Sequence, residues 1–176
     1  MNIKGKEVHL ILFFPMIFPY FTLFALFCIF TNTFMETLFY NNGIFLMFLL
    51  IIAYIIAFIC SIIFLIKNIK LKVDSKKILH INMIIKLIQI PAYLLIFLIG
   101  LLCLITIFTM GIIFILIIFN CMAIFLTGLI GLCGIIRGFF EKKLKLKYSV
   151  INAILQFIFC IDIISCIVTY RKIKNI

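Results

Sequence analysis

Residues 44–66, IFLMFLLIIAYIIAFICSIIFLI, form a run of 23 residues without a charged side chain. About 20 apolar residues, each rising 1.5 Å in a helix, cross the roughly 30 Å hydrocarbon core of a bilayer. The chain of 176 residues is 68% hydrophobic and 12% charged, whereas soluble domains are about 45–50% apolar and about 25% charged. The composition therefore predicts an integral membrane protein and excludes both a soluble globular domain and a disordered chain.

Further apolar runs on both sides of this stretch predict more membrane spans. Residues 87–136 carry no charge over about 50 positions, too many for one span, so we expect two helices joined at Thr109-Met110-Gly111. Pro15 and Pro19 lie inside the first run and predict a kink, because each lacks a backbone N–H. The predicted fold is an all-α polytopic helical bundle in a single transmembrane domain, 1–176, with spans at 8–30, 44–66, 87–108, 112–136 and 150–170.

The last of these runs is the least apolar. Its twelve Val, Ile, Leu and Phe residues favour insertion by roughly 4–7 kcal/mol, against a cost of about 2.5–3.5 kcal/mol for Asp162 near its middle. A helix lying on the membrane surface would carry Lys or Arg along its polar face, and 150–170 has neither. We expect five spans, with a four-span core plus a re-entrant or surface helix as the alternative.

The basic residues predict the orientation of the chain. The N-terminal segment and the loops after the second and fourth spans carry 2, 6 and 5 Lys or Arg residues, and the loops after the first and third spans carry none. By the positive-inside rule, the N-terminus is cytoplasmic and the protein is a multi-pass protein of the plasma membrane. The formal charge of +11 then indicates contact with anionic lipid headgroups and not with nucleic acid.

Four polar residues inside the apolar runs are candidates for an intramembrane site: Asp162, Asn152, Gln156 and Asn120. A carboxylate at membrane depth must be protonated or must face a partner, water or another protein. One interpretation is a cation or proton site, or a contact with another subunit. The other is a carboxylate that is hydrogen-bonded within a packed bundle.

Small residues in the fourth span predict a helix-packing face. Thr127, Gly131, Gly134 and Gly138 recur at spacings of three, four or seven and so lie on one side of a helix. Small residues at such spacing let two helix backbones approach closely. The pattern fits packing within the bundle and dimerisation equally well.

We find no catalytic, metal or cofactor motif in the sequence. The seven cysteines lie in apolar runs without a C-x-x-C pair, and His9 and His80 are far apart. We therefore expect no catalytic residue, no bound metal and no cofactor, and an enzyme is the class with least support.

The stretch 86–93, KLIQIPAY, followed by an apolar hairpin and by TGLIG at 127–131, resembles uncharacterised small multi-pass membrane proteins of low-GC Gram-positive bacteria. The resemblance covers about residues 86–137 and implies a bacterial host but no activity. We expect an accessory or interaction subunit of a membrane complex, in transport, secretion or immunity to a membrane-active peptide, that pairs with another membrane protein or forms a homo-oligomer. The alternative is a small transporter or channel with a polar path around Asp162.

Overall fold

A computed structural model describes residues 3–105 and 110–175. The described residues form seven helices. Four of them are long and apolar enough to cross a membrane, which confirms the all-α polytopic class. The helices are α1 (Ile3–Phe30), α2 (Asn32–Phe39), α3 (Gly43–Lys70), α4 (Ser75–Cys103), α5 (Met110–Phe140), α6 (Leu146–Leu155) and α7 (Ile161–Lys174).

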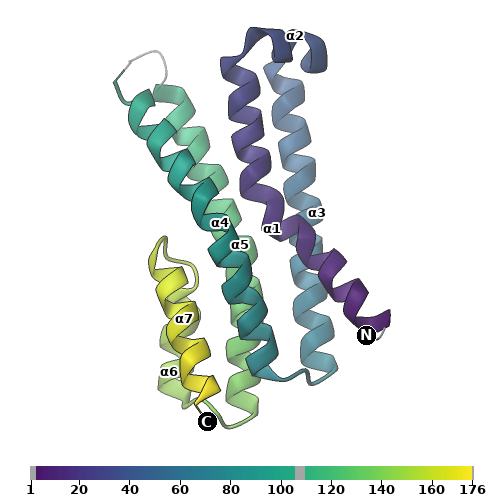
Figure 1. Ribbon diagram of the computed structural model, residues 1–176, viewed down its shortest axis with the longest axis vertical. Coiled ribbons are helices and arrows are strands. Elements are labelled where there is room, and N and C mark those ends of the chain that lie inside the picture. The colour runs from purple at the N-terminus through teal and green to yellow at the C-terminus, as the bar shows by residue number, and fades with distance from the viewer. Residues whose placement is uncertain (1–2, 106–109, 176) are drawn as a thin grey trace.

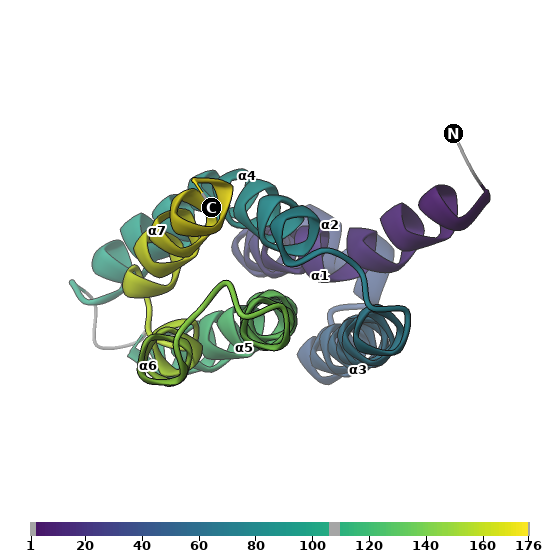
Figure 2. The ribbon, with the colours of Figure 1, turned by 90° about the horizontal axis from the view of Figure 1, so that it is seen from below.

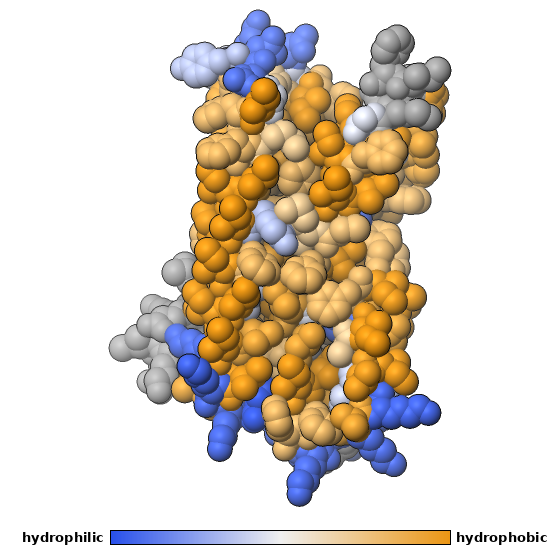
Figure 3. Space-filling model, turned by 180° about the vertical axis from the view of Figure 1, so that it is seen from behind, coloured by the Kyte–Doolittle hydropathy of each residue, from blue (hydrophilic) through white to orange (hydrophobic). Residues whose placement is uncertain are grey.

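The long helices pack as two neighbouring pairs, α1 with α3 and α4 with α5 (Figures 1 and 2). The short helices α6 and α7 form a hairpin against the α4–α5 pair, with α7 on α4 and α6 on α5. Of the turn predicted at 109–111, Thr109 lies outside the described residues, while Met110 and Gly111 already belong to α5. Figure 3 shows an apolar belt across one face of the molecule, with hydrophilic side chains gathered at its two ends.

The single helix expected over 150–170 is absent, so the preferred count of five spans is corrected to four. Helix α6 ends at Leu155, and α7 begins at Ile161 after Cys160, whose φ of 64° interrupts the helical path. With 10 and 14 residues, the two helices are about 15 and 21 Å long, too short to cross a 30 Å core. Residues 146–174 therefore form a helical hairpin, which agrees with the four-span alternative; because its turn lies beside the middle of α4 (Figure 1), we refer to it as the re-entrant hairpin.

The proline kink in α1 is stabilised by a residue of α4. Pro19 has no N–H to give to the carbonyl of Pro15, four residues earlier. The Gln89 side chain takes that role, because its Nε2 donates to the carbonyl oxygens of Pro15 at 2.9 Å and of Met16 at 3.2 Å. Tyr93 Oη in turn donates to Gln89 Oε1 at 3.1 Å. The bend visible in α1 (Figure 1) thus does not leave this carbonyl without a donor.

The re-entrant hairpin predicts that both chain ends lie on the same side of the membrane, since an even number of spans separates them. Epitope tags at the N- and C-termini, tested by protease protection in inside-out and right-side-out vesicles, are expected to be cleaved in the same preparation. Cleavage of the two tags in opposite preparations would restore the fifth span.

The contact between Gln89 and the α1 kink predicts that Gln89→Leu destabilises the protein by about 1–3 kcal/mol, because the Pro15 carbonyl loses its donor. In a Pro19→Ala background the backbone N–H returns, so the same change is expected to cost less. Thermal unfolding in detergent measures both, with Tyr93→Phe as the control for the tyrosine hydrogen bond. An equal loss in the two backgrounds would contradict this role of Gln89.

Candidate functional site

The centre of the polar cluster is an ion pair between α4 and α7. Lys86 Nζ lies 2.7 Å from Asp162 Oδ2, and the two side chains are only 1% and 3% exposed. Lys86 follows the start of α4 at Ser75 by eleven residues, about 16 Å along the helix axis. Asp162 lies in the first turn of α7, where the positive end of the helix dipole favours a carboxylate.

Amide side chains extend this pair across the hairpin. Asn82, one turn before Lys86 on α4, donates through Nδ2 to Gln156 Oε1 at 3.4 Å and to Cys166 Sγ at 3.1 Å. Gln156 Nε2 donates to Ser165 Oγ at 3.4 Å. These contacts join α4, the end of α6 and the middle of α7 through buried side chains.

Asn152 links the two arms of the hairpin directly. Its Oδ1 accepts hydrogen bonds from Ser165 Oγ at 2.8 Å and from Thr169 Oγ1 at 3.2 Å, both on α7. Its Nδ2 donates to the backbone carbonyl of Tyr148 at 2.9 Å on its own helix. The polar side chains of 150–170 are thus satisfied by α4 and by other side chains of the hairpin, which is the physical reason for the correction above.

The predicted packing face of α5 lies against α4 and the hairpin. A Cβ atom on Gly131 would collide with the Gln156 and Asn82 side chains, and one on Gly134 would lie 2.7 Å from Leu79 Cγ on α4. Gly138 is close to Ile173 of α7. Thr127 is fully buried, and its hydroxyl bonds to carbonyls of its own helix. The structure thus places these small residues inside the fold.

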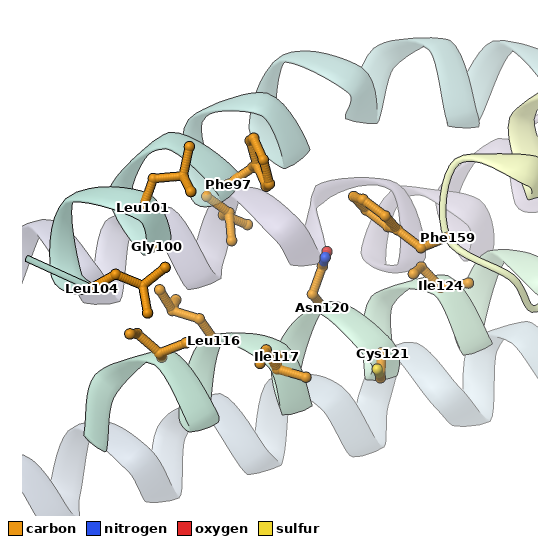
Figure 4. A pocket seen from close by; sticks show the side chains of 12 residues that line it. Phe97, Gly100, Leu101, Leu104, Leu116, Ile117, Asn120, Cys121, Ile124 and Phe159 are labelled. Atoms are coloured by element: carbon orange, nitrogen blue, oxygen red, sulfur yellow. The ribbon is translucent and has the colours of Figure 1, made fainter. Parts of the chain in front are cut away.

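Asn120 is separate from the other predicted polar residues. It points into a groove of about 360 Å³ between α4 and α5, which Phe159 of the hairpin turn also lines (Figure 4). Among the described residues, none donates a hydrogen bond to its buried Oδ1. Apart from Asn120 and Cys121 the lining is apolar, as in Phe97, Leu101 and Phe159.

A second hollow of about 300 Å³ adjoins this groove across Phe97 and Phe159. Asp162 and Tyr93 contribute to its lining. Together the two hollows leave the far half of the α4–α5 face uncovered by the hairpin, whose turn lies beside the middle of α4 (Figure 1). The near half is filled by α6 and α7.

Sequence reasoning missed Lys86 and Asn82. When basic residues are counted to assign the orientation, Lys86 is counted with the lysines of the preceding loop. Asn82 lies between those lysines and Lys86, so it too is assigned to the loop and not to a membrane span. One signal could have found them: Asn82, Lys86, Gln89 and Tyr93 recur at spacings of four, three and four, so they share one face of a helix. Three of these four make side-chain hydrogen bonds to another segment.

A second ion-pair cluster lies at one end of the bundle, where the α3–α4 and α5–α6 connections meet. Lys143 Nζ is 2.9 Å from Asp74 Oδ1 and 2.7 Å from Glu141 Oε2. The hydrogen bond from Lys143 holds the pKa of Asp74 below its usual value. Burial opposes ionisation of Glu141, but bonds from Lys143 and Ser75 still lower the pKa of that carboxyl. This cluster fixes the two connections against each other.

The arrangement around Lys86 is that of a charge-compensated structural site. In the part of the chain that is described, no group of three or more His, Cys, Asp or Glu side chains could hold a metal ion. The ammonium and carboxylate neutralise one another, and amides and hydroxyls satisfy most of the remaining polar atoms. Comparisons with protein-family models, curated proteins and solved structures give no match for this chain.

The buried pair predicts a large coupling between Lys86 and Asp162. Lys86→Met or Asp162→Leu alone leaves an uncompensated buried charge and is expected to cost about 3–5 kcal/mol, whereas the double variant recovers most of that loss. Thermal unfolding gives the stability, and hydrogen exchange of peptides from 146–174 shows whether the hairpin itself opens. Losses that simply add in the double variant would mean that the two charges are not coupled.

Proposed function

We propose that the protein is an accessory or interaction subunit of a membrane complex in the bacterial plasma membrane, with the cytoplasmic side at its basic end. The observation that carries the proposal is the groove between α4 and α5, which the protein's own hairpin fills only in part. The occupant we propose is a transmembrane helix of another protein that offers a hydrogen-bond donor to Asn120.

The chemistry of the groove favours a protein occupant over lipid alone. The buried Asn120 Oδ1 is an acceptor without a donor among the described residues, and acyl chains carry no donor. The hairpin tip next to the groove exposes Ile158, Phe159 and Cys160, where the backbone leaves the helical conformation. Such backbone is tolerated at membrane depth where protein covers it or where it lines a water-filled cavity. A helix lying in the groove beside the tip would supply this cover.

The shape of the groove favours a different protein over a second copy. In a two-fold dimer the same patch of each copy faces itself, so two concave grooves would meet and remain unfilled. A single convex helix fits the groove, whose lining runs from Ile113 to Ile124 on α5, about 16 Å at 1.5 Å per residue.

The proposed orientation rests on the basic residues. The re-entrant hairpin returns Arg171, Lys172 and Lys174 to the end that holds the two basic loops. All Lys and Arg residues except the buried Lys86 then lie on one side, which the positive-inside rule assigns to the cytoplasm.

The alternative of a transporter or channel draws less support. Asp162 already has a counter-charge in Lys86. Asn152 and Gln156 bond to other side chains of the hairpin and α4, and Asn120 lies apart from them. These residues therefore form a closed network in place of a continuous polar path.

Filling the groove tests the proposal. Neither Gly100 nor Gly111 has an atom within 4 Å of a Cβ added to it, but only Gly100 lines the groove. We expect a photoreactive residue at Leu101 to crosslink to one other integral membrane protein in native membranes. The Gly100→Leu variant should lose that product, while Gly111→Leu retains it, since only the first side chain enters the groove.

A photoreactive residue at Ile59, which is exposed on α3, serves as the control for non-specific capture. The decisive result is a product seen at Leu101 and not at Ile59, abolished by Gly100→Leu. A product of twice the protein's own mass would identify a homo-oligomer and overturn the proposal of a different partner. Absence of any protein product, or one that persists in Gly100→Leu, would overturn the proposed docking of a partner helix.

A further inference from the structure

A hollow of about 500 Å³ lies at the connection between α5 and α6. This connection joins the end of a membrane-spanning helix to the start of the re-entrant hairpin. The hollow therefore lies at the level of the lipid headgroups. Its lining combines apolar and basic side chains: Phe139, Phe140, Lys142, Lys143, Leu144, Lys145 and Leu146.

Two of the three lysines in this hollow carry uncompensated charge. Lys143 is committed to Asp74 and Glu141. Lys142 and Lys145 are exposed, and within the described ranges 3–105 and 110–175 neither forms an ion pair with an acidic side chain. Lys142 is held by the turn itself, in a left-handed conformation with φ of 58°. The hollow therefore presents two positive side chains, and the structure pairs neither of them with an acidic side chain of the described residues.

Apolar side chains lie directly beside these charges. Phe140 and Leu146 are 64% and 62% exposed, and they flank the connection that carries Lys142 and Lys145. Helix α6 begins at Leu146 without a side-chain cap, so the positive end of its dipole faces the same connection. A ligand that matches this surface has an anionic head and an apolar body.

We propose that this hollow is a binding site for the headgroup of an anionic phospholipid. The phosphate lies between Lys142 and Lys145, and the acyl chains run along Phe140 and Leu146. The proposal rests on charge complementarity and on the position of the hollow at the membrane surface, and it is independent of the partner helix proposed above.

The sequence contains no tryptophan, which makes a single-tryptophan reporter possible. Phe140→Trp protein is reconstituted in phosphatidylcholine vesicles that contain brominated phosphatidylglycerol or brominated phosphatidylcholine, with the bromines close to the headgroup. A lysine near an anionic surface contributes about fivefold in affinity. We expect brominated phosphatidylglycerol to quench the tryptophan fluorescence more strongly than brominated phosphatidylcholine does. This preference should fall by about fivefold or more in the double variant Lys142→Gln/Lys145→Gln.

Matched controls separate this site from general attraction to a basic surface. Lys70→Gln/Lys72→Gln removes two charges from the other basic loop and is expected to leave the lipid preference of the reporter at residue 140 unchanged. A Phe45→Trp reporter at the opposite end should show no preference between the two lipids.

Three results would overturn the proposal. Equal quenching by both lipids at residue 140 would exclude a selective site. If the two double lysine variants lost the preference for phosphatidylglycerol equally, that preference would come from general surface charge and not from this hollow. Relief of quenching by inorganic phosphate beyond that given by chloride at equal ionic strength would assign the hollow to free phosphate.

Discussion

A backbone that leaves the helical conformation inside a bilayer must find its hydrogen bonds within protein or water, because hydrocarbon offers none. The turn of the α6–α7 hairpin meets this constraint with its own backbone hydrogen bonds, such as those from Ile161 N to Phe159 O and from Asp162 N to Ile158 O. The Asp162 side chain meanwhile pairs with Lys86 of α4, at the centre of the polar cluster. The loss of hydration of both ions offsets much of their mutual attraction. The pair therefore acts mainly on register: a shifted placement of α7 along α4 would leave two isolated charges in an apolar interior.

The close approach that this register needs comes from α5. Gly131 and Gly134 leave room for the side chains of Gln156, Asn82 and Leu79, so the hairpin lies against the helix backbone. Because the hairpin is only half as long as the helices it covers, the same packing that closes one half of the α4–α5 face leaves a groove along the other half. The groove is thus a direct consequence of a re-entrant segment replacing a full span.

The four spans could be predicted because an uncharged run such as 44–66 has one low-energy state in a bilayer, and its length is visible in the sequence. The break near Cys160 could not, because a hydropathy sum treats Asp162 as an isolated charge and has no term for Lys86, 76 positions away. The small residues of α5 marked a packing face, yet their spacing carries no information on what packs there. Polarity alone groups Asn120 with Asp162 in the sequence. The structure separates them, because Asp162 pairs with Lys86 and Asn120 lines the groove, and nothing in the sequence marks the hairpin turn that lies between them.

The α4–α5 face has two halves that differ in how their described polar side chains are bonded. Most polar atoms are paired in the half that the hairpin covers, and the other half contains the open groove. On the hairpin side even Asn82 Oδ1, which has no partner, belongs to a side chain with no exposed surface, so no other protein reaches it. On the other side Asn120 faces an open groove. The Asn120 Oδ1 atom itself is buried, so an outside donor reaches it only when the Asn120 side chain turns toward the groove. Leaving such an acceptor unsatisfied is costly in an apolar medium. The half of the face that the chain leaves incomplete is therefore the half from which a partner would be recognised.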